Sequence, residues 1–113
     1  MPERIVHKVM TAAEYSQLQR DGVFYGSVAD VADGFIHLSC GSQLTGTLDR
    51  HYRGAVGLML VAVDLAWLGD TVRWEPARGG ELFPHIYGPL PIQAVLSVGS
   101  VERGADGALK LPG

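Results

Sequence analysis

The chain has 113 residues, and its 9 lysines and arginines against 12 aspartates and glutamates give a net charge of −3. Hydrophobic residues make up 47% of the sequence and charged residues 19%, which supplies a packed core and is too little charge for a disordered polyelectrolyte. These figures exclude two full-sized domains, a coiled coil and a general binder of nucleic-acid backbone. We expect a single domain over residues 1–113, with a core over about 4–102 and a polar tail over 103–113.

Cysteine content and apolar runs indicate a soluble protein of the reducing cytoplasm. Cys40 is the single cysteine, which excludes an intramolecular disulfide and any site with several cysteine ligands. The N-terminal residues are polar, and no signal-peptide apolar region follows them. The longest apolar stretch, 56–68, is interrupted by Gly57 and Asp64 and is too short to span a bilayer.

The first half of the chain predicts two strands and two helices. Residues 4–10 have the β-branched content of a strand. Thr11 and Glu14 have the spacing of a capping box, so we expect a helix to begin there and to end at Gly22. The next expected elements are a strand over 34–39 and a helix over 42–52 that ends at Gly54.

The second half predicts strands without further helix. Residues 58–64 are mostly apolar at odd and even positions alike, which is typical of a central strand covered on both faces. The proline- and glycine-rich stretch 76–93 is predicted to be a loop with one short extended piece at 85–87. The remaining expected elements are a turn over 67–70, a strand over 71–75 and a last strand over 94–102. Two helices packed on a mainly antiparallel sheet give an α+β fold.

Alternation along three short strands predicts polar side chains on one face of each, because successive side chains point to opposite faces. In the strand at 34–39, Ile36 and Leu38 point one way, and His37 and Ser39 point the other. The other two segments have the same pattern, with the polar residues Arg73, Glu75, His85 and Tyr87.

Two interpretations of these polar residues stay open. In the first they line one cleft, where the histidines act as acid or base, a carboxylate orients them, and Arg73 binds a phosphate or carboxylate. In the second they face solvent on a one-sided antiparallel sheet, and Arg73 and Glu75 form a surface pair. His7 is equally ambiguous, because it is either a core histidine or a cleft residue from the first strand.

The sequence lacks the motifs of several other kinds of site. The four histidines lack metal-ligand spacing, so no metal is expected. His51 lies near the C-terminal end of a predicted helix, where the helix dipole favours a cation, so His51 needs no functional explanation. No phosphate-binding glycine motif, nucleophile elbow or basic patch occurs, so neither a known nucleotide loop nor nucleic-acid binding is predicted.

Two longer strings resemble a known family. The segments are Gly34-Phe-Ile-His-Leu-Ser39 and Phe83-Pro-His-Ile-Tyr-Gly-Pro-Leu90, together with the strand at 5–7 and Arg73-Trp-Glu75. On these segments the chain is identified as a member of the domain-of-unknown-function 952 family, over about residues 4–100. That family has no established biochemical activity, so the resemblance implies membership and leaves function open.

A more remote resemblance is to the ADP-ribosyltransferase-like fold, especially the RNA 2′-phosphotransferases. The matching features, in order, are His7, the helix end at 18–22, His37-Leu-Ser39 and the strand 58–64. This resemblance implies a split, mainly antiparallel sheet around a cleft for NAD or an ADP-ribosylated intermediate. It places His7, His37 and Ser39 on the nucleotide, and Glu75 or His85 nearest the ribose carbon that nicotinamide leaves.

These observations leave an enzyme and a binding module as competing hypotheses. As an enzyme the protein uses NAD or a similar nucleotide. Glu75 then stabilises an oxocarbenium-like ribose, and His37 and His85 are the acid–base groups. The residues that bind the ligand are His7, Ser39, Arg73 and Tyr87. As a non-catalytic module it holds a small anionic ligand through Arg73, His37 and His85. An interaction domain without a ligand is the third hypothesis, and the sequence does not fix the oligomeric state.

Overall fold

A computed structural model describes residues 3–52, 55–103 and 109–110 of the chain. Its helices are α1 (Ala12–Asp21), α2 (Val28–Asp33) and α3 (Leu44–His51). Its strands are β1 (Ile5–Thr11), β2 (Val23–Phe24), β3 (Ile36–His37), β4 (Leu58–Asp64), β5 (Val72–Pro76), β6 (Leu82–Ile86), β7 (Leu90–Pro91), β8 (Val95–Ser100), β9 (Glu102–Arg103) and β10 (Leu109–Lys110). Short 3₁₀ turns occupy Gly41–Gln43, Leu65–Trp67, Gly69–Thr71, Arg78–Gly80 and Ile92–Ala94. The α+β class predicted from the sequence is confirmed.

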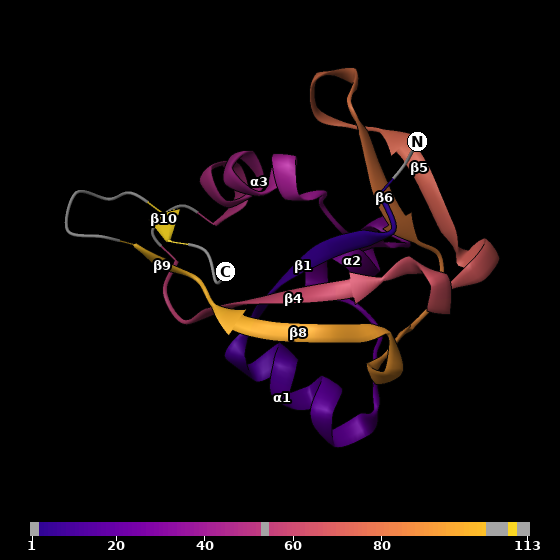
Figure 1. Ribbon diagram of the computed structural model, residues 1–113, viewed down its shortest axis with the longest axis horizontal. Coiled ribbons are helices and arrows are strands. Elements are labelled where there is room, and N and C mark those ends of the chain that lie inside the picture. The colour runs from indigo at the N-terminus through magenta and orange to yellow at the C-terminus, as the bar shows by residue number, and fades with distance from the viewer. Residues whose placement is uncertain (1–2, 53–54, 104–108, 111–113) are drawn as a thin grey trace.

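Two three-stranded antiparallel sheets form the framework. The first has the order β1-β4-β8, with β4 central as its apolar pattern predicts, and the second has the order β3-β6-β5. His7 and Ser39 join the two sheets, because each backbone N–H donates to the other residue's carbonyl, at 2.8 and 2.9 Å. Figure 1 shows the β5–β6 hairpin projecting at an angle from the layer that β1, β4 and β8 form.

Alternate residues of β1 and β4 pack on opposite faces of the first sheet. Val6 and Val61 belong to the larger core cluster, which also contains Leu18 of α1. Val9 and Leu60 belong to a second cluster, with residues of α3. In Figure 1, α1 and α3 accordingly lie on either side of the β1–β4 pair.

The first helix follows its local sequence signals. Thr11 accepts a hydrogen bond from the Glu14 N–H at 3.1 Å, and Glu14 accepts one from the Thr11 N–H at 2.9 Å, which completes the predicted capping box. Gly22 ends the helix in the left-handed conformation, with a φ of 76°. The predicted helix over 42–52 is α3 preceded by a 3₁₀ turn, and Gly54, its predicted end, lies outside the described residues.

The expectation of two helices is wrong, because α2 is a third. A second capping box begins it: Ser27 and Asp30 exchange hydrogen bonds of 2.9 and 3.1 Å between their side chains and N–H groups. The helix has six residues, and Val28 and Val31 lie on its exposed side. A helix this short with apolar residues outside carries no amphipathic pattern, so periodicity does not find it.

The predicted loop over 76–93 is also wrong in part, because it contains β6, the middle strand of the second sheet. Pro84 lies within this strand, where proline normally argues against a central position. Its carbonyl accepts from the Leu38 N–H at 3.0 Å, so its ring nitrogen faces the short β3 and not β5. The strand therefore keeps its pairing with β5 in spite of the proline.

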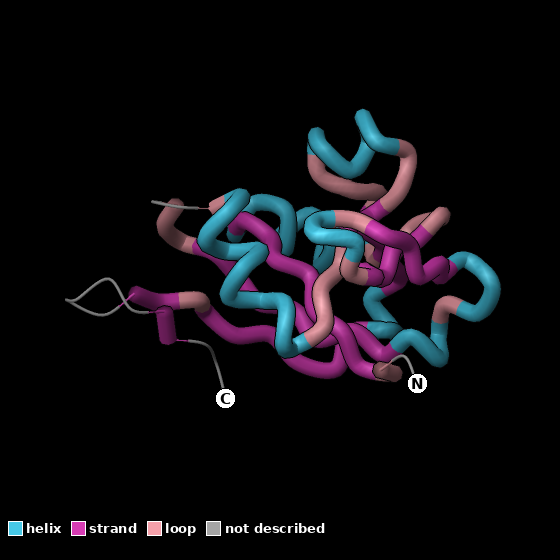
Figure 2. Tube along the Cα trace, turned by 90° about the horizontal axis from the view of Figure 1, so that it is seen from above, coloured by secondary structure: helices cyan, strands magenta, loops and turns pink. Residues whose placement is uncertain are grey.

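The predicted tail over 103–113 is described only in part. Glu102 and Arg103 pair with Lys110 and Leu109 as a two-stranded antiparallel ribbon, drawn in magenta at the left of Figure 2. Residues 104–108 and 111–113 lie outside the described residues.

Candidate functional site

A cleft of about 680 Å³ opens between β1, α2, α3 and the β3–β6 pair. The chain contains 4 histidines, and all of them line this cleft: His7, His37, His51 and His85. A cleft of this size suits a small-molecule ligand. Of the residues for which two interpretations stayed open, His37, Ser39 and His85 are among the lining residues of this cleft.

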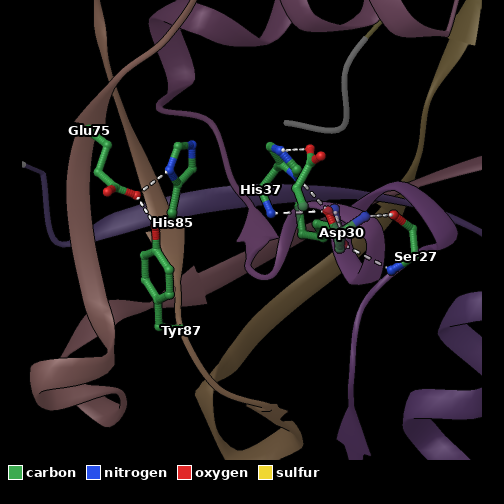
Figure 3. A network of polar contacts seen from close by, with 8 residues as sticks. Ser27, Asp30, His37, Glu75, His85 and Tyr87 are labelled. Carbon is green, nitrogen blue, oxygen red and sulfur yellow. Dashed lines mark hydrogen bonds and ion pairs between the residues drawn. The ribbon is translucent and has the colours of Figure 1, made fainter.

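His85 is fixed by a carboxylate outside the cleft. Its Nδ1 lies 2.8 Å from Oε1 of Glu75, and the hydroxyl of Tyr87 donates to the same oxygen at 2.7 Å (Figure 3). A carboxylate only accepts, so Nδ1 carries the proton in the neutral ring and Nε2 keeps its lone pair. The hydrogen bonds from Tyr87 and His85 lower the pKa of Glu75, and the bond to Glu75 raises the pKa of Tyr87.

Phe35 holds the histidines of the second sheet side by side. Its ring stacks on His85 with centroids 4.1 Å apart and is tilted against His37 at 4.6 Å. His37 and His85 are register partners in the β3–β6 pair, and their ring centroids are 5.4 Å apart. Neighbouring strands thus present the two imidazoles together.

His37 is held by two carboxylates of α2. Its Nδ1 lies 2.6 Å from Oδ1 of Asp30, and its Nε2 lies 3.0 Å from Oδ2 of Asp33. Figure 3 shows the ring of His37 turned toward α2, away from Glu75. When protonated, the ring donates to both carboxylates.

A buried ion pair lies beneath His37. Nζ of Lys8 is 2.9 Å from Oδ2 of Asp30, and the two side chains are only 4% and 2% exposed. Burial opposes ionisation of Asp30, but the hydrogen bond from His37 and the charge of Lys8 outweigh it and hold the Asp30 pKa well below its usual range. Neither residue was predicted for the site.

His7, Ser39 and Thr47 also line the cleft. The hydroxyls of Ser39 and Thr47 are 2.9 Å apart. Nδ1 of His7 is buried and has no hydrogen-bond partner within the part of the chain that the structure describes. Burial lowers the pKa of His7, so its imidazole is neutral near pH 7.

The predicted site residues fall into two groups. His7, His37, Ser39 and His85 line the cleft. Glu75, Arg73 and Tyr87 lie behind His85: the guanidinium carbon of Arg73 is 5.3 Å from the centroid of the Tyr87 ring, and none of the three is among the cleft-lining residues. Glu75 is therefore placed to orient His85 and not to touch a ribose in the cleft.

Several lining residues were not found by sequence reasoning. They are Lys8, Glu14, Asp30, Asp33, Thr47, Arg50 and His51. The Ser27–Asp30 capping spacing and a lysine between Val6 and Met10 on the apolar face of β1 were the available signals for the ion pair. His51 was attributed to the helix dipole, although its side chain lines the cleft.

Within residues 3–52, 55–103 and 109–110, no three histidine, cysteine, aspartate or glutamate side chains group to hold a metal ion. None of the described helices is long and apolar enough to cross a membrane.

Fold and cleft together define an α+β protein whose two antiparallel sheets meet at a histidine-lined site. The family model described as "Protein of unknown function (DUF952)" matches residues 9–98, and the chain belongs to this family, as predicted from its sequence. No curated protein matches the chain.

The solved structures similar to this chain are of protein CC0527 from Caulobacter crescentus. Its crystal structure is 40% identical, with a TM-score of 0.88, and the match covers 94% of this chain and 93% of that one. A crystal structure of a double mutant of that protein is 39% identical, with a TM-score of 0.87 and the same coverage. Its solution structure is 40% identical, with a TM-score of 0.81, covering 93% and 90%. The family description names no activity, so function has to come from the site.

Proposed function

We propose that the protein is an enzyme that acts on a nucleotide of the NAD or ADP-ribose class, with His85 as general base and His37 as general acid. One observation supports this most strongly. Two histidines on neighbouring strands line the same cleft, and each is fixed at Nδ1 by its own carboxylate. A carboxylate at Nδ1 sets the tautomer and stabilises the imidazolium that forms when Nε2 takes a proton.

The ligand class is inferred from the size and lining of the cleft. Its volume of about 680 Å³ accommodates a nucleotide and not only a single small anion. Val9, Val28 and Phe83 supply apolar wall for a base or ribose, and Lys8 and Arg50 supply positive charge for phosphate. The order of the histidine, His-Leu-Ser and apolar-strand motifs, which resembles NAD-using folds, favours NAD over other nucleotides.

The proposed chemical step is a substitution at the ribose carbon. The bond between the ribose carbon and the nicotinamide nitrogen breaks, and nicotinamide leaves with the bonding pair as a neutral molecule. The oxygen of water or of an acceptor hydroxyl bonds to the ribose carbon, and Nε2 of His85 takes the proton that this oxygen loses. Where the leaving group is an oxygen instead, His37 supplies its proton.

Glu75 acts in this proposal as a positioning residue. It accepts from His85 and Tyr87 through one oxygen, Oε1, and does not line the cleft. Its negative charge stabilises the imidazolium of His85, which replaces the direct role at the ribose that the sequence suggested.

The test is nicotinamide release from NAD by the wild type and by His85→Asn. Asparagine keeps an N–H for Glu75 and removes the Nε2 base, so we expect turnover to fall by about 10²- to 10⁴-fold while ADP-ribose affinity is retained. Arg20→Met, on the exposed side of α1, is the control and keeps wild-type turnover. If millimolar NAD and ADP-ribose neither raise the melting temperature nor shift histidine NMR signals, the nucleotide class is wrong.

A non-catalytic binding module is the second candidate, and the contacts of His37 favour it. Both ring nitrogens of His37 already contact carboxylates, which holds the ring in place and engages the N–H groups that an acid would donate. This candidate predicts that ADP-ribose binds and that wild-type protein releases no nicotinamide from NAD. Measured turnover that depends on His85 would exclude it.

A further inference from the structure

The buried ammonium of Lys8 lines the cleft of the proposed enzyme without a role in its acid–base chemistry. Lys8 lies between Val6 and Met10 on the face of β1 that belongs to the larger core cluster. Its side chain is 4% exposed. A cation in such a place requires hydrogen-bond acceptors, because a buried donor without one is costly.

Asp30 meets only part of this requirement. Its Oδ1 accepts from the N–H and from Nδ1 of His37, and its Oδ2 accepts from the Ser27 N–H and from Nζ of Lys8. These four donors fill the lone-pair positions of the carboxylate. The ammonium has three N–H groups, and its ion pair with Asp30 engages one of them, so two remain for further acceptors.

The other carboxylates of the cleft are engaged elsewhere. Asp33 contacts Nε2 of His37, and Glu14 accepts from the Thr11 N–H at the start of α1. Arg50 lines the same cleft. The described lining thus holds two cations, Lys8 and Arg50, and three carboxylates, each of which already accepts from a donor of the protein.

We propose that Lys8 forms the floor of an oxyanion subsite and donates to a phosphoryl oxygen of the ligand. The proposal rests on the proposed function in taking this cleft as the nucleotide site. It adds Lys8 as the residue that selects for phosphate. Asp30 holds the ammonium of Lys8 in place, and the two remaining N–H groups of this ammonium bind phosphoryl oxygens.

Lysine-selective NMR with inorganic pyrophosphate, free of divalent metal, tests the subsite. The chain has two lysines, Lys8 and Lys110, so two side-chain signals are expected and the second is the internal reference. We expect pyrophosphate to shift the Lys8 signal saturably and to leave Lys110 in place. Binding that leaves the Lys8 signal unmoved, or no binding at all, overturns the proposal.

Variants give an independent measurement. Lys8→Met alone leaves Asp30 as a buried, unpaired carboxylate, which destabilises the fold. The variant to compare with wild type is therefore Lys8→Met/Asp30→Asn, because the asparagine is uncharged and its amide oxygen still accepts hydrogen bonds. We expect its pyrophosphate affinity to fall by about 10- to 100-fold, the effect of a lost charge-assisted hydrogen bond. Arg20→Met removes an exposed cation that is not among the cleft-lining residues, so we expect it to keep wild-type affinity. Wild-type affinity in the double variant refutes the subsite.

The two proposals fail in distinguishable ways. Pyrophosphate binding that depends on Lys8, without turnover of NAD, supports the subsite and contradicts the enzyme. Turnover of NAD that depends on His85, together with wild-type pyrophosphate affinity in Lys8→Met/Asp30→Asn, supports the enzyme and overturns the subsite.

Discussion

Replacing Lys8 by methionine is expected to destabilise the protein more than any comparable change at its surface. Methionine has a similar length and fills the same space, but it leaves the Asp30 carboxylate, which is 2% exposed, without its cation. Removing one partner of a buried ion pair costs about 3–5 kcal/mol. Asp30 keeps three other donors, so we expect the lower end, about 3 kcal/mol. For a domain of this size that lowers the melting temperature by roughly 12–24 °C.

Urea unfolding followed by circular dichroism measures the effect, with Arg20→Met as the matched control. Arg20 pairs with Asp21 at the surface, with side chains 71% and 37% exposed, and its loss costs less than about 1 kcal/mol. Lys8→Met/Asp30→Asn should recover more than about 1 kcal/mol relative to the sum of the single variants, because the two side chains are coupled. If Lys8→Met is as mild as the control, or if the single effects simply add, the account of the buried pair is wrong.

Three further predictions follow from single contacts. A Cβ on Gly26, whose φ is +119°, would lie 2.8 Å from Cβ of Asp30, so Gly26→Ala should lower the free energy of unfolding in urea by at least about 2 kcal/mol. Gly34 has a φ of +90° but open space around it, so Gly34→Ala should lower the free energy of unfolding by about 1 kcal/mol. Equal losses in the two variants would argue against the clash at Gly26. The folded-state pKa of Asp30 lies below its unfolded value of about 3.9, so its stabilisation is complete above that pH and is lost as pH falls toward the folded value. The urea midpoint should therefore drop more steeply below about pH 4 in wild type than in Asp30→Asn, and parallel curves would contradict this. Glu75→Gln should return the raised pKa of Tyr87 toward its ordinary value, measured by ultraviolet titration, and an unchanged titration would show that their hydrogen bond does not form in solution.

Local signals in the sequence accounted for much of the fold. The capping box of Thr11 and Glu14 needs only four consecutive residues, so it predicts α1 without tertiary information. Strand alternation likewise predicts that His37 faces away from the buried Ile36 and Leu38, because the alternation of a strand is fixed by its backbone.

What the sequence did not reveal depends on contacts between distant segments. The strand β6 forms because β3 and β5 pair with it on both sides, and no local pattern around Pro84 shows this. Lys8 and Asp30 meet only when α2 packs beside β1, so neither residue alone signals a site. Glu75 shares the predicted face with Arg73, yet parity does not tell whether that face lines the cleft or lies behind it.

Histidine NMR during an ADP-ribose titration tests the central claim most directly, because the chain has 4 histidines and all of them line the cleft. The account predicts that the side-chain signals of His37 and His85 shift together, with one dissociation constant, and that His85→Asn leaves the shift of His37 in place. An ADP-ribose titration at millimolar concentration in which neither signal moves would contradict it.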